Sequence, residues 1–345
     1  MEDGGDRRGT IHLVGSVPLA SAQDVMRTAS ALLGPRLRRV PDGETGVRAN
    51  WIRWQSAVFQ RHPAFEVAVP ADPAAYSPGS HVRLRPAAAD APLAFGPLGY
   101  AEAALASYAS LGELRRAGRV PRDLRFQVSL PTPLAPVTWF VAPEDQPRVE
   151  PAYEAALLAE VDEIARAIPH EDLSIQWDVA VEFALLEGLR PAHFRPLEDG
   201  ICSRLVRLAN GVPPGVEVGF HLCYGDADHA HFKEPDDTAK LVRVANAVVA
   251  GVARPIDWIH LPVPRGRTDA AYFSPLAGLS LGAETRLHLG LVHLTDGAAG
   301  AERRIRAARR FAGDFGVGTE CGLGRRPPAT IPRLLALHAE IADAL

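Results

Sequence analysis

Hydrophobic and polar positions follow two periods along most of the chain. Short apolar runs between turn residues, such as 216–223, are typical of buried strands, whereas 22–33 repeats its apolar positions with the period of a helix. Ser21 is placed to cap that helix, and Gly34 to end it. The predicted strands are 11–16, 37–40, 125–130, 173–178, 216–223, 255–261, 286–293 and 315–321.

Helical patterns separate most of these strands. They lie at 22–33, 51–61, 100–117, 153–167, 201–208, 237–252, 301–312 and 331–344. Eight strands alternating with helices predict an α/β fold, a single (β/α)8 TIM barrel whose functional groups gather at the C-terminal ends of the strands. Residues from about 68 to 97 are rich in Pro and Ala and predict an irregular excursion with a small hairpin. We therefore interpret 1–345 as one barrel domain.

Composition narrows the class of protein. The 345 residues are 47% hydrophobic, which is ample for a large core. The net charge of −4 lacks the basic excess of a nucleic-acid-binding protein. No apolar run approaches the length that spans a membrane, and the polar N-terminus does not resemble a signal peptide. We expect a cytoplasmic protein without nucleic-acid or membrane partners.

Candidate chemistry lies at the ends of the predicted strands. His221 and Cys223 are two residues apart, so both side chains point to the same face of an extended strand. An imidazole and a soft thiolate aimed at one point suit a zinc ion. Cys321 follows another predicted strand, and parallel strands of one barrel end at the same mouth. Three such ligands leave an open position, as in catalytic zinc sites.

These motifs resemble cobalamin-independent methionine synthase. His-Leu-Cys-Tyr at 221–224 is similar to the His-x-Cys-Tyr zinc motif of that family, and Glu-Cys-Gly-Leu at 320–323 to the Asp-Cys-Gly-Leu sequence with its last zinc cysteine. Ile-Gln-Trp-Asp at 175–178 resembles the strand whose Asp contacts the amino-acid substrate. Val-Gly-Ser at 14–16 is similar to the first strand of the family's catalytic barrel, and His293 falls where the family has a proposed proton donor.

The resemblance implies the superfamily that also contains uroporphyrinogen decarboxylases and epoxyalkane–coenzyme M transferases. It implies a zinc-dependent transferase in which His221, Cys223 and Cys321 hold the metal and a thiol is alkylated, most often with a methyl group. The donor would be a methyl-folate, a sulfonium or a methyl-cobamide, and the sequence leaves open which of these it is. Asp178 would then orient the thiol substrate, and His293 would act as general acid.

Two features depart from the family pattern. The family has a zinc-ligating Glu at the end of the sixth strand, whereas this chain reads His-Leu-Pro-Val-Pro at 260–264. His260 is a candidate for the fourth ligand, with a water molecule as the alternative. In addition, Val179 stands where the family has a Glu after the substrate-binding Asp.

The polar and aromatic run 39–55 predicts a wall of the substrate site. Its candidate substrate-binding residues, together with Ser16 from the first strand, are Asp42, Glu44, Arg48, Trp51 and Gln55. Alternatively, the two carboxylates only build a turn, because Pro-Asp-Gly is turn chemistry by itself. Two other functions are also open. One is a zinc-dependent lyase or hydrolase on the same scaffold, and the other is a metal-binding protein without catalysis.

Overall fold

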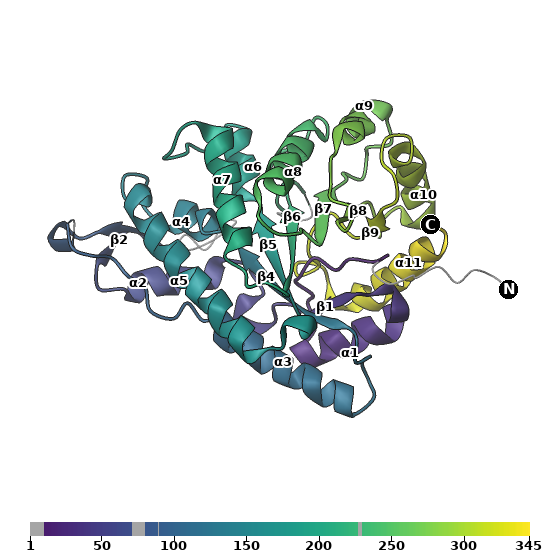
Figure 1. Cartoon of the computed structure of the whole chain (residues 1–345), viewed down its shortest axis with the longest axis horizontal. Helices are drawn as coiled ribbons and strands as arrows, with labels where there is room; N and C mark the ends of the chain where they lie inside the picture. Colours follow the sequence, from purple (N-terminus) through teal and green to yellow (C-terminus); the bar gives the residue numbers. More distant parts are fainter. Residues whose placement is uncertain (1–9, 71–79, 89, 227–229) are drawn as a thin grey trace.

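A curled sheet of seven parallel strands forms the centre of the protein (Figure 1). The computed structural model describes residues 10–70, 80–88, 90–226 and 230–345. The strand order is β1-β4-β5-β6-β7-β8-β9, so each strand lies next to those that precede and follow it in the sheet. The strands are β1 (Arg39–Pro41), β4 (Arg125–Pro131), β5 (Leu173–Val179), β6 (Glu217–Leu222), β7 (Trp258–Pro262), β8 (Arg286–Gly290) and β9 (Gly316–Val317).

The first predicted strand, 11–16, forms isolated bridges instead of a regular strand. Ile11 pairs in parallel with Leu37 on one side and with Val317 on the other, and Ser16 pairs with Gly43. This segment therefore lies between the two edges of the sheet, next to β1 and β9. Both neighbours are short, which leaves little ladder to pair with. The fold is thus a seven-stranded parallel sheet rather than eight regular strands.

Helices cover the outer face of the sheet (Figure 1). The first runs from Ala22 to Leu33 as predicted, since Ser21 Oγ accepts a hydrogen bond from the Asp24 backbone N–H at 3.1 Å. Helix α5 begins before the predicted boundary, with a proline in its first turn. The helices are α1 (Ala22–Leu33), α2 (Ser56–Arg61), α3 (Tyr100–Arg116), α4 (Leu134–Phe140), α5 (Gln146–Ala167), α6 (Val181–Leu186), α7 (Leu197–Asn210), α8 (Ala239–Gly251), α9 (Ala270–Phe273), α10 (Gly297–Ala308) and α11 (Ile331–Asp343).

The predicted excursion contains an antiparallel hairpin of β2 (Phe65–Val69) and β3 (His81–Leu84). It projects from the end of the molecule opposite the C-terminus (Figure 1). Residues 71–79 and 89 of the excursion lie outside the described residues. The interpretation of the whole chain as one domain stays a prediction.

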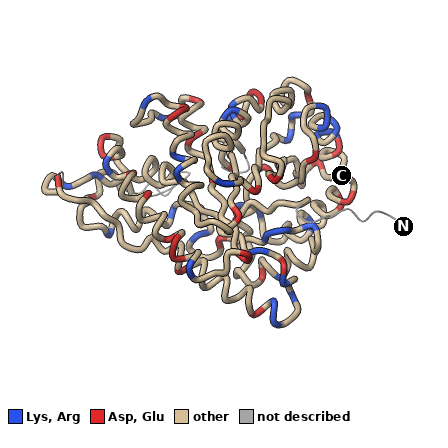
Figure 2. The backbone as a smooth tube through the Cα atoms, in the orientation of Figure 1, with Lys and Arg blue, Asp and Glu red and all other residues tan. Residues whose placement is uncertain are grey.

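Charged residues of both signs are interspersed along the chain (Figure 2). Within the described ranges, no helix combines the length and the apolar character that crossing a membrane requires.

Strand register brings three polar residues to one level inside the sheet. His221 of β6 pairs with Asp178 of β5 on one side and with His260 of β7 on the other. Register partners in a parallel sheet point to the same face. All three side chains are buried. Asp178 and His221 lie at the C-terminal ends of their strands, where the sequence pattern predicts the functional groups, and His260 lies in the middle of β7.

Candidate metal centre

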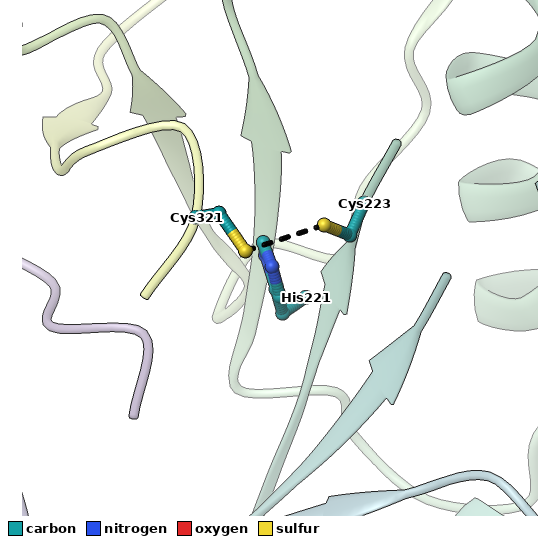
Figure 3. Close-up of side chains that lie close together, drawn as sticks. All are labelled: His221, Cys223 and Cys321. Carbon is teal, nitrogen blue, oxygen red and sulfur yellow. Dashed lines mark hydrogen bonds between the residues drawn. The ribbon is translucent and has the colours of Figure 1, made fainter. Parts of the chain in front are cut away.

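Three potential metal ligands meet at the end of β6 (Figure 3). The ligand atoms of His221, Cys223 and Cys321 all lie within 4.8 Å of one another. The two Sγ atoms are 3.5 Å apart. Cys321 comes from the loop after β9, which the curled sheet places across from β6. Two thiols and one imidazole are a donor set that zinc prefers.

His221 presents one particular nitrogen to the thiols. Its Nδ1 lies 2.8 Å from Nδ1 of His260, whereas its Nε2 is buried without a hydrogen-bond partner. Leaving a buried polar atom unsatisfied costs about 1–3 kcal/mol. Burial, with His260 nearby, lowers the pKa of His221 well below its usual value, so the ring is uncharged at neutral pH. An uncharged ring with a free Nε2 fits a metal ligand, and the residues present therefore fit zinc.

Each cysteine is held by a backbone feature of its own loop. The Gly225 N–H donates to Cys223 Sγ at 3.2 Å, the type of outer contact that orients metal-binding thiolates. Thr319 Oγ donates to the carbonyl oxygen of Cys321 at 2.7 Å. The adjacent thiol of Cys223, together with burial, raises the pKa of Cys321 well above its usual value. A bound cation would oppose that shift.

The loop after Cys321 packs directly onto the first segment of the chain. A Cβ added at Gly322 would lie 2.2 Å from Ser16 Oγ, so a larger residue there would have to displace Ser16 or the loop. The Gly324 N–H donates to the same oxygen at 3.2 Å, and the Leu323 N–H to the Ser16 carbonyl at 2.7 Å. Ser16 thus fixes the position of the loop that carries Cys321.

A cavity of about 60 Å³ opens beside the three ligands. It is lined by all three of them. The lining residues that also bring polar or charged groups are Ser16, Glu44, Trp51, Asp178, Asp226 and Arg325. Four of these six, Ser16, Glu44, Trp51 and Asp178, are residues for which the sequence predicts substrate contact or catalysis.

Two carboxyl groups share this cavity. Burial raises the pKa of Asp178 well above its usual value, and the nearby Glu44 adds to the shift. The Gln176 side-chain N–H opposes it by donating to Asp178 Oδ1 at 2.8 Å. Burial also raises the pKa of Glu44 to about 7, against the pull of Arg48. Two adjacent carboxyls in a poorly solvated site cannot both ionise easily. The pair therefore retains protons near neutral pH.

Backbone strain marks the same wall of the cavity. Glu44 and Trp51 have φ angles of 50° and 48°, and they are the non-glycine residues with positive φ in the described part of the chain. Such conformations cost about 1–3 kcal/mol each and cluster at functional sites. Both side chains line the cavity. The strained backbone therefore occurs at the residues whose side chains reach the site.

Three predicted substrate residues support this wall without lining it. Asp42 accepts hydrogen bonds from Arg48 at 2.5 Å, from Ser107 at 2.8 Å and from the Glu44 N–H at 2.9 Å. These contacts agree with the alternative interpretation of this carboxylate as a turn residue. Gln55 is fully buried, where it accepts from the Tyr153 hydroxyl at 2.7 Å and donates to a backbone carbonyl.

His293 lies outside the cavity lining. Its Nε2 is 2.8 Å from the Val263 carbonyl oxygen, and its Nδ1 is 3.7 Å from Oε1 of Glu320. Burial, aided by the charge of Arg304, lowers the pKa of His293 to about 3. The structure therefore places this predicted general acid next to Glu320 and outside the cavity that Asp178 lines.

The sequence pattern does not single out Asp226 and Arg325 as cavity residues. Arg325 donates from Nη1 to the Asp226 carbonyl oxygen at 3.0 Å, and the same nitrogen lies 4.0 Å from its carboxylate. The only sequence signal is proximity, since each follows a cysteine ligand within four residues. The contact itself joins loops that are far apart in the chain.

The fold and the site together define an α/β protein with a curled parallel sheet and a candidate metal centre at its C-terminal mouth. No family model and no curated protein matches the sequence. Solved structures do match. The B12-independent methionine synthase from Shewanella sp. W3-18-1, in complex with selenomethionine, aligns with a TM-score of 0.64 and 15% identity over 97% of both chains.

Two further structures are similar. A putative vitamin-B12 independent methionine synthase from Listeria monocytogenes has a TM-score of 0.60 and 13% identity over 96% of both chains. A methyltransferase from Methanosarcina mazei has a TM-score of 0.50 and 14% identity over 96% of this chain and 94% of that one. The expected resemblance to methionine synthases is thus confirmed for the fold.

Proposed function

We propose that this protein is a zinc-dependent methyltransferase that acts on a thiol. The observation that carries the proposal is the convergence of His221, Cys223 and Cys321 beside a cavity that also contains Asp178 and Glu44. Three protein ligands leave a position for a substrate atom. The names of the similar structures, two methionine synthases and a methyltransferase, support the same reaction class.

The chain's own groups have distinct roles in this proposal. When bound, zinc lowers the pKa of a coordinated thiol, so that a thiolate exists at neutral pH. Asp178 and Glu44 line the cavity next to the ligands and would hold the amino group of an aminothiol once they release their protons. Trp51 lines the same cavity. Arg325 supplies positive charge toward an anionic end of the substrate.

His293 stays the predicted proton donor, but its position constrains how it acts. Because burial lowers the pKa of His293 to about 3 and raises the pKa of the neighbouring Glu320 to about 8, the proton near neutral pH would reside on Glu320, 3.7 Å from His293 Nδ1, and His293 would act through that carboxyl. His293→Ala should then lower kcat with unchanged zinc content. Asp178→Asn should mainly raise KM for aminothiols, with little effect on thiols that lack an amino group.

The proposal is tested with protein purified without chelators. We expect about one zinc per chain by elemental analysis. Mass spectrometry should detect S-methylated product from homocysteine, cysteine or another small thiol, with a methyl-folate, sulfonium or methyl-cobamide donor. Cys321→Ser should lose zinc and activity yet keep its circular dichroism spectrum, because the core of the sheet does not depend on the metal.

Other outcomes would contradict the proposal. A zinc-loaded protein that alkylates no thiol but cleaves a carbonyl compound would be a lyase or hydrolase. Zinc binding without turnover of any tested compound would indicate a metal-binding protein without catalysis. Absence of zinc with both cysteines reduced would exclude the metal centre.

A further inference from the structure

His260 makes a contact that the proposed metal chemistry does not yet use. It lies in the middle of β7, fully buried, in register between His221 of β6 and His288 of β8. Its Nδ1 is 2.8 Å from Nδ1 of His221. The group of ligand atoms found among the described residues contains His221 and the two cysteines but not His260. Its ring therefore lies behind the ligand rather than beside it.

The contact between the two rings dictates where the protons are. Each uncharged imidazole carries one proton, and a hydrogen bond between two Nδ1 atoms needs one donor and one acceptor. A metal ligand needs a free lone pair on His221 Nε2, which is the buried and unpartnered atom. The proton of His221 must then reside on Nδ1 and be donated to Nδ1 of His260. His260 in turn carries its own proton on Nε2, which is also buried without a hydrogen-bond partner.

The surrounding residues confine the His260 ring. A Cβ at Gly318 would lie 3.3 Å from His260 Nε2 and 2.8 Å from the His12 carbonyl oxygen, so glycine makes room for the ring. The ring of His12 packs against it with centroids 5.4 Å apart. Packing on both sides leaves the acceptor atom little freedom to turn away from His221.

We propose that His260 is a positioning residue, which fixes the tautomer and orientation of His221 and so prepares the metal site. The inference rests on the proposed zinc function. Histidine ligands usually donate their second N–H to a carboxylate, a backbone carbonyl or water. Here the acceptor is an uncharged imidazole. Two thiolates already balance the charge of Zn²⁺, and a carboxylate at this fully buried place would carry an unpaired charge.

The test compares two amide side chains, each of which can place an oxygen where one of the two ring nitrogens of His260 lies. In His260→Asn the side-chain oxygen can occupy the place of Nδ1, whereas in His260→Gln it reaches the place of Nε2, toward Gly318. We expect zinc affinity, measured by competition with a chromogenic chelator, to fall about 10- to 100-fold in the Gln variant. The Asn variant should stay within about threefold of the wild type, since its acceptor is retained. Absorption spectra of the Co²⁺-loaded proteins should differ from the wild-type spectrum more in the Gln variant than in the Asn variant.

His288→Gln is the matched control. His288 is equally buried in the neighbouring strand and is the register partner of His260. It should bind zinc like the wild type, and thermal melts should show that each variant is folded. Equal affinities of the two His260 variants, or an equal loss in His288→Gln, would overturn the positioning role while leaving the zinc function intact. A wild-type protein without zinc would overturn both.

Discussion

At the scale of single residues, Glu44 combines two features that reduce the stability of the folded protein. Its backbone has a positive φ, and its half-buried carboxyl faces Asp178 in a poorly solvated cavity. Asp42 braces the turn by accepting the Glu44 N–H. At this one position the protein thus maintains an unfavourable backbone conformation and a carboxyl that burial makes harder to ionise. Residues that reduce stability in this way are expected where substrate binding recovers the cost.

Glu44→Gln should flatten the pH dependence of stability in the metal-free protein. The folded pKa of about 7 lies above the ordinary value of 4.5, so the folded state favours the protonated form. The stabilising effect is present below about pH 4.5 and is lost as the pH rises through 7. Urea unfolding should therefore show that the free energy of unfolding of the wild type is about 1–2 kcal/mol lower at pH 8 than at pH 5. The Glu44→Gln variant should lack this difference.

The control for this measurement is Glu302→Gln, which removes an exposed carboxylate from α10. It should keep the wild-type difference between the two pH values. A Glu44→Gln protein with the same pH dependence as the wild type would show that this carboxyl is ionised in the folded state.

At the scale of elements, the candidate metal centre depends on loops rather than on strands alone. β6 supplies His221 at its end, but both cysteines follow their strands. The loop with Cys321 is held by the segment around Ser16, which itself bridges β1 and β9 instead of forming a regular strand. The irregular first segment is therefore part of the site. Instead of a continuous ladder of strand hydrogen bonds, it makes hydrogen bonds between Ser16 and the loop that carries Cys321.

Gly322→Ala should displace that loop and weaken zinc binding by about tenfold or more, because the new Cβ would overlap Ser16 Oγ. The double variant Ser16→Ala with Gly322→Ala removes the overlapping oxygen and should recover part of the affinity. Chelator competition measures all three proteins, with Ser16→Ala alone as the reference. Wild-type affinity in Gly322→Ala would show that the loop shifts freely.

At the scale of the whole molecule, the two ends of the sheet have different tasks. The C-terminal end holds the candidate metal ligands. Toward the other end, Glu217 of β6 binds Arg38 at 2.6 Å, Arg39 at 2.7 Å and Arg125 at 3.1 Å. These ion pairs join β1, β4 and β6 across the interior. They stabilise the sheet at a distance from the chemistry.

Glu217→Gln should therefore destabilise the protein without changing the metal site. Arg39 is buried and would lose its charged partner, which typically costs about 3–5 kcal/mol. Urea unfolding measures the loss, and zinc stoichiometry of the folded protein should stay at the wild-type value. Glu66→Gln, at a more exposed ion pair on the hairpin, should cost less than about 1 kcal/mol. If Glu217→Gln lowered the free energy of unfolding by as little, its ion pairs would not stabilise the sheet as we propose.

The sequence alone predicted most of the elements and the three candidate metal ligands. Apolar periodicity located α1 and the strands β4 to β8, because burial of one face or stripe leaves a regular pattern. The spacing of His221 and Cys223 placed both on one face, and the common direction of parallel strands brought Cys321 to the same mouth. These conclusions need only local geometry and the direction of the chain.

Tertiary structure decided the rest. Turn residues show no fixed direction of their side chains, so only the fold separates Glu44 and Trp51, which line the cavity, from Asp42 and Arg48, which brace it. The contact of His260 with His221 depends on strand register and on room at Gly318. Pairing at the edges of a sheet and contacts between distant loops arise from packing in three dimensions. No periodicity along the chain records them, because they join residues that the sequence separates.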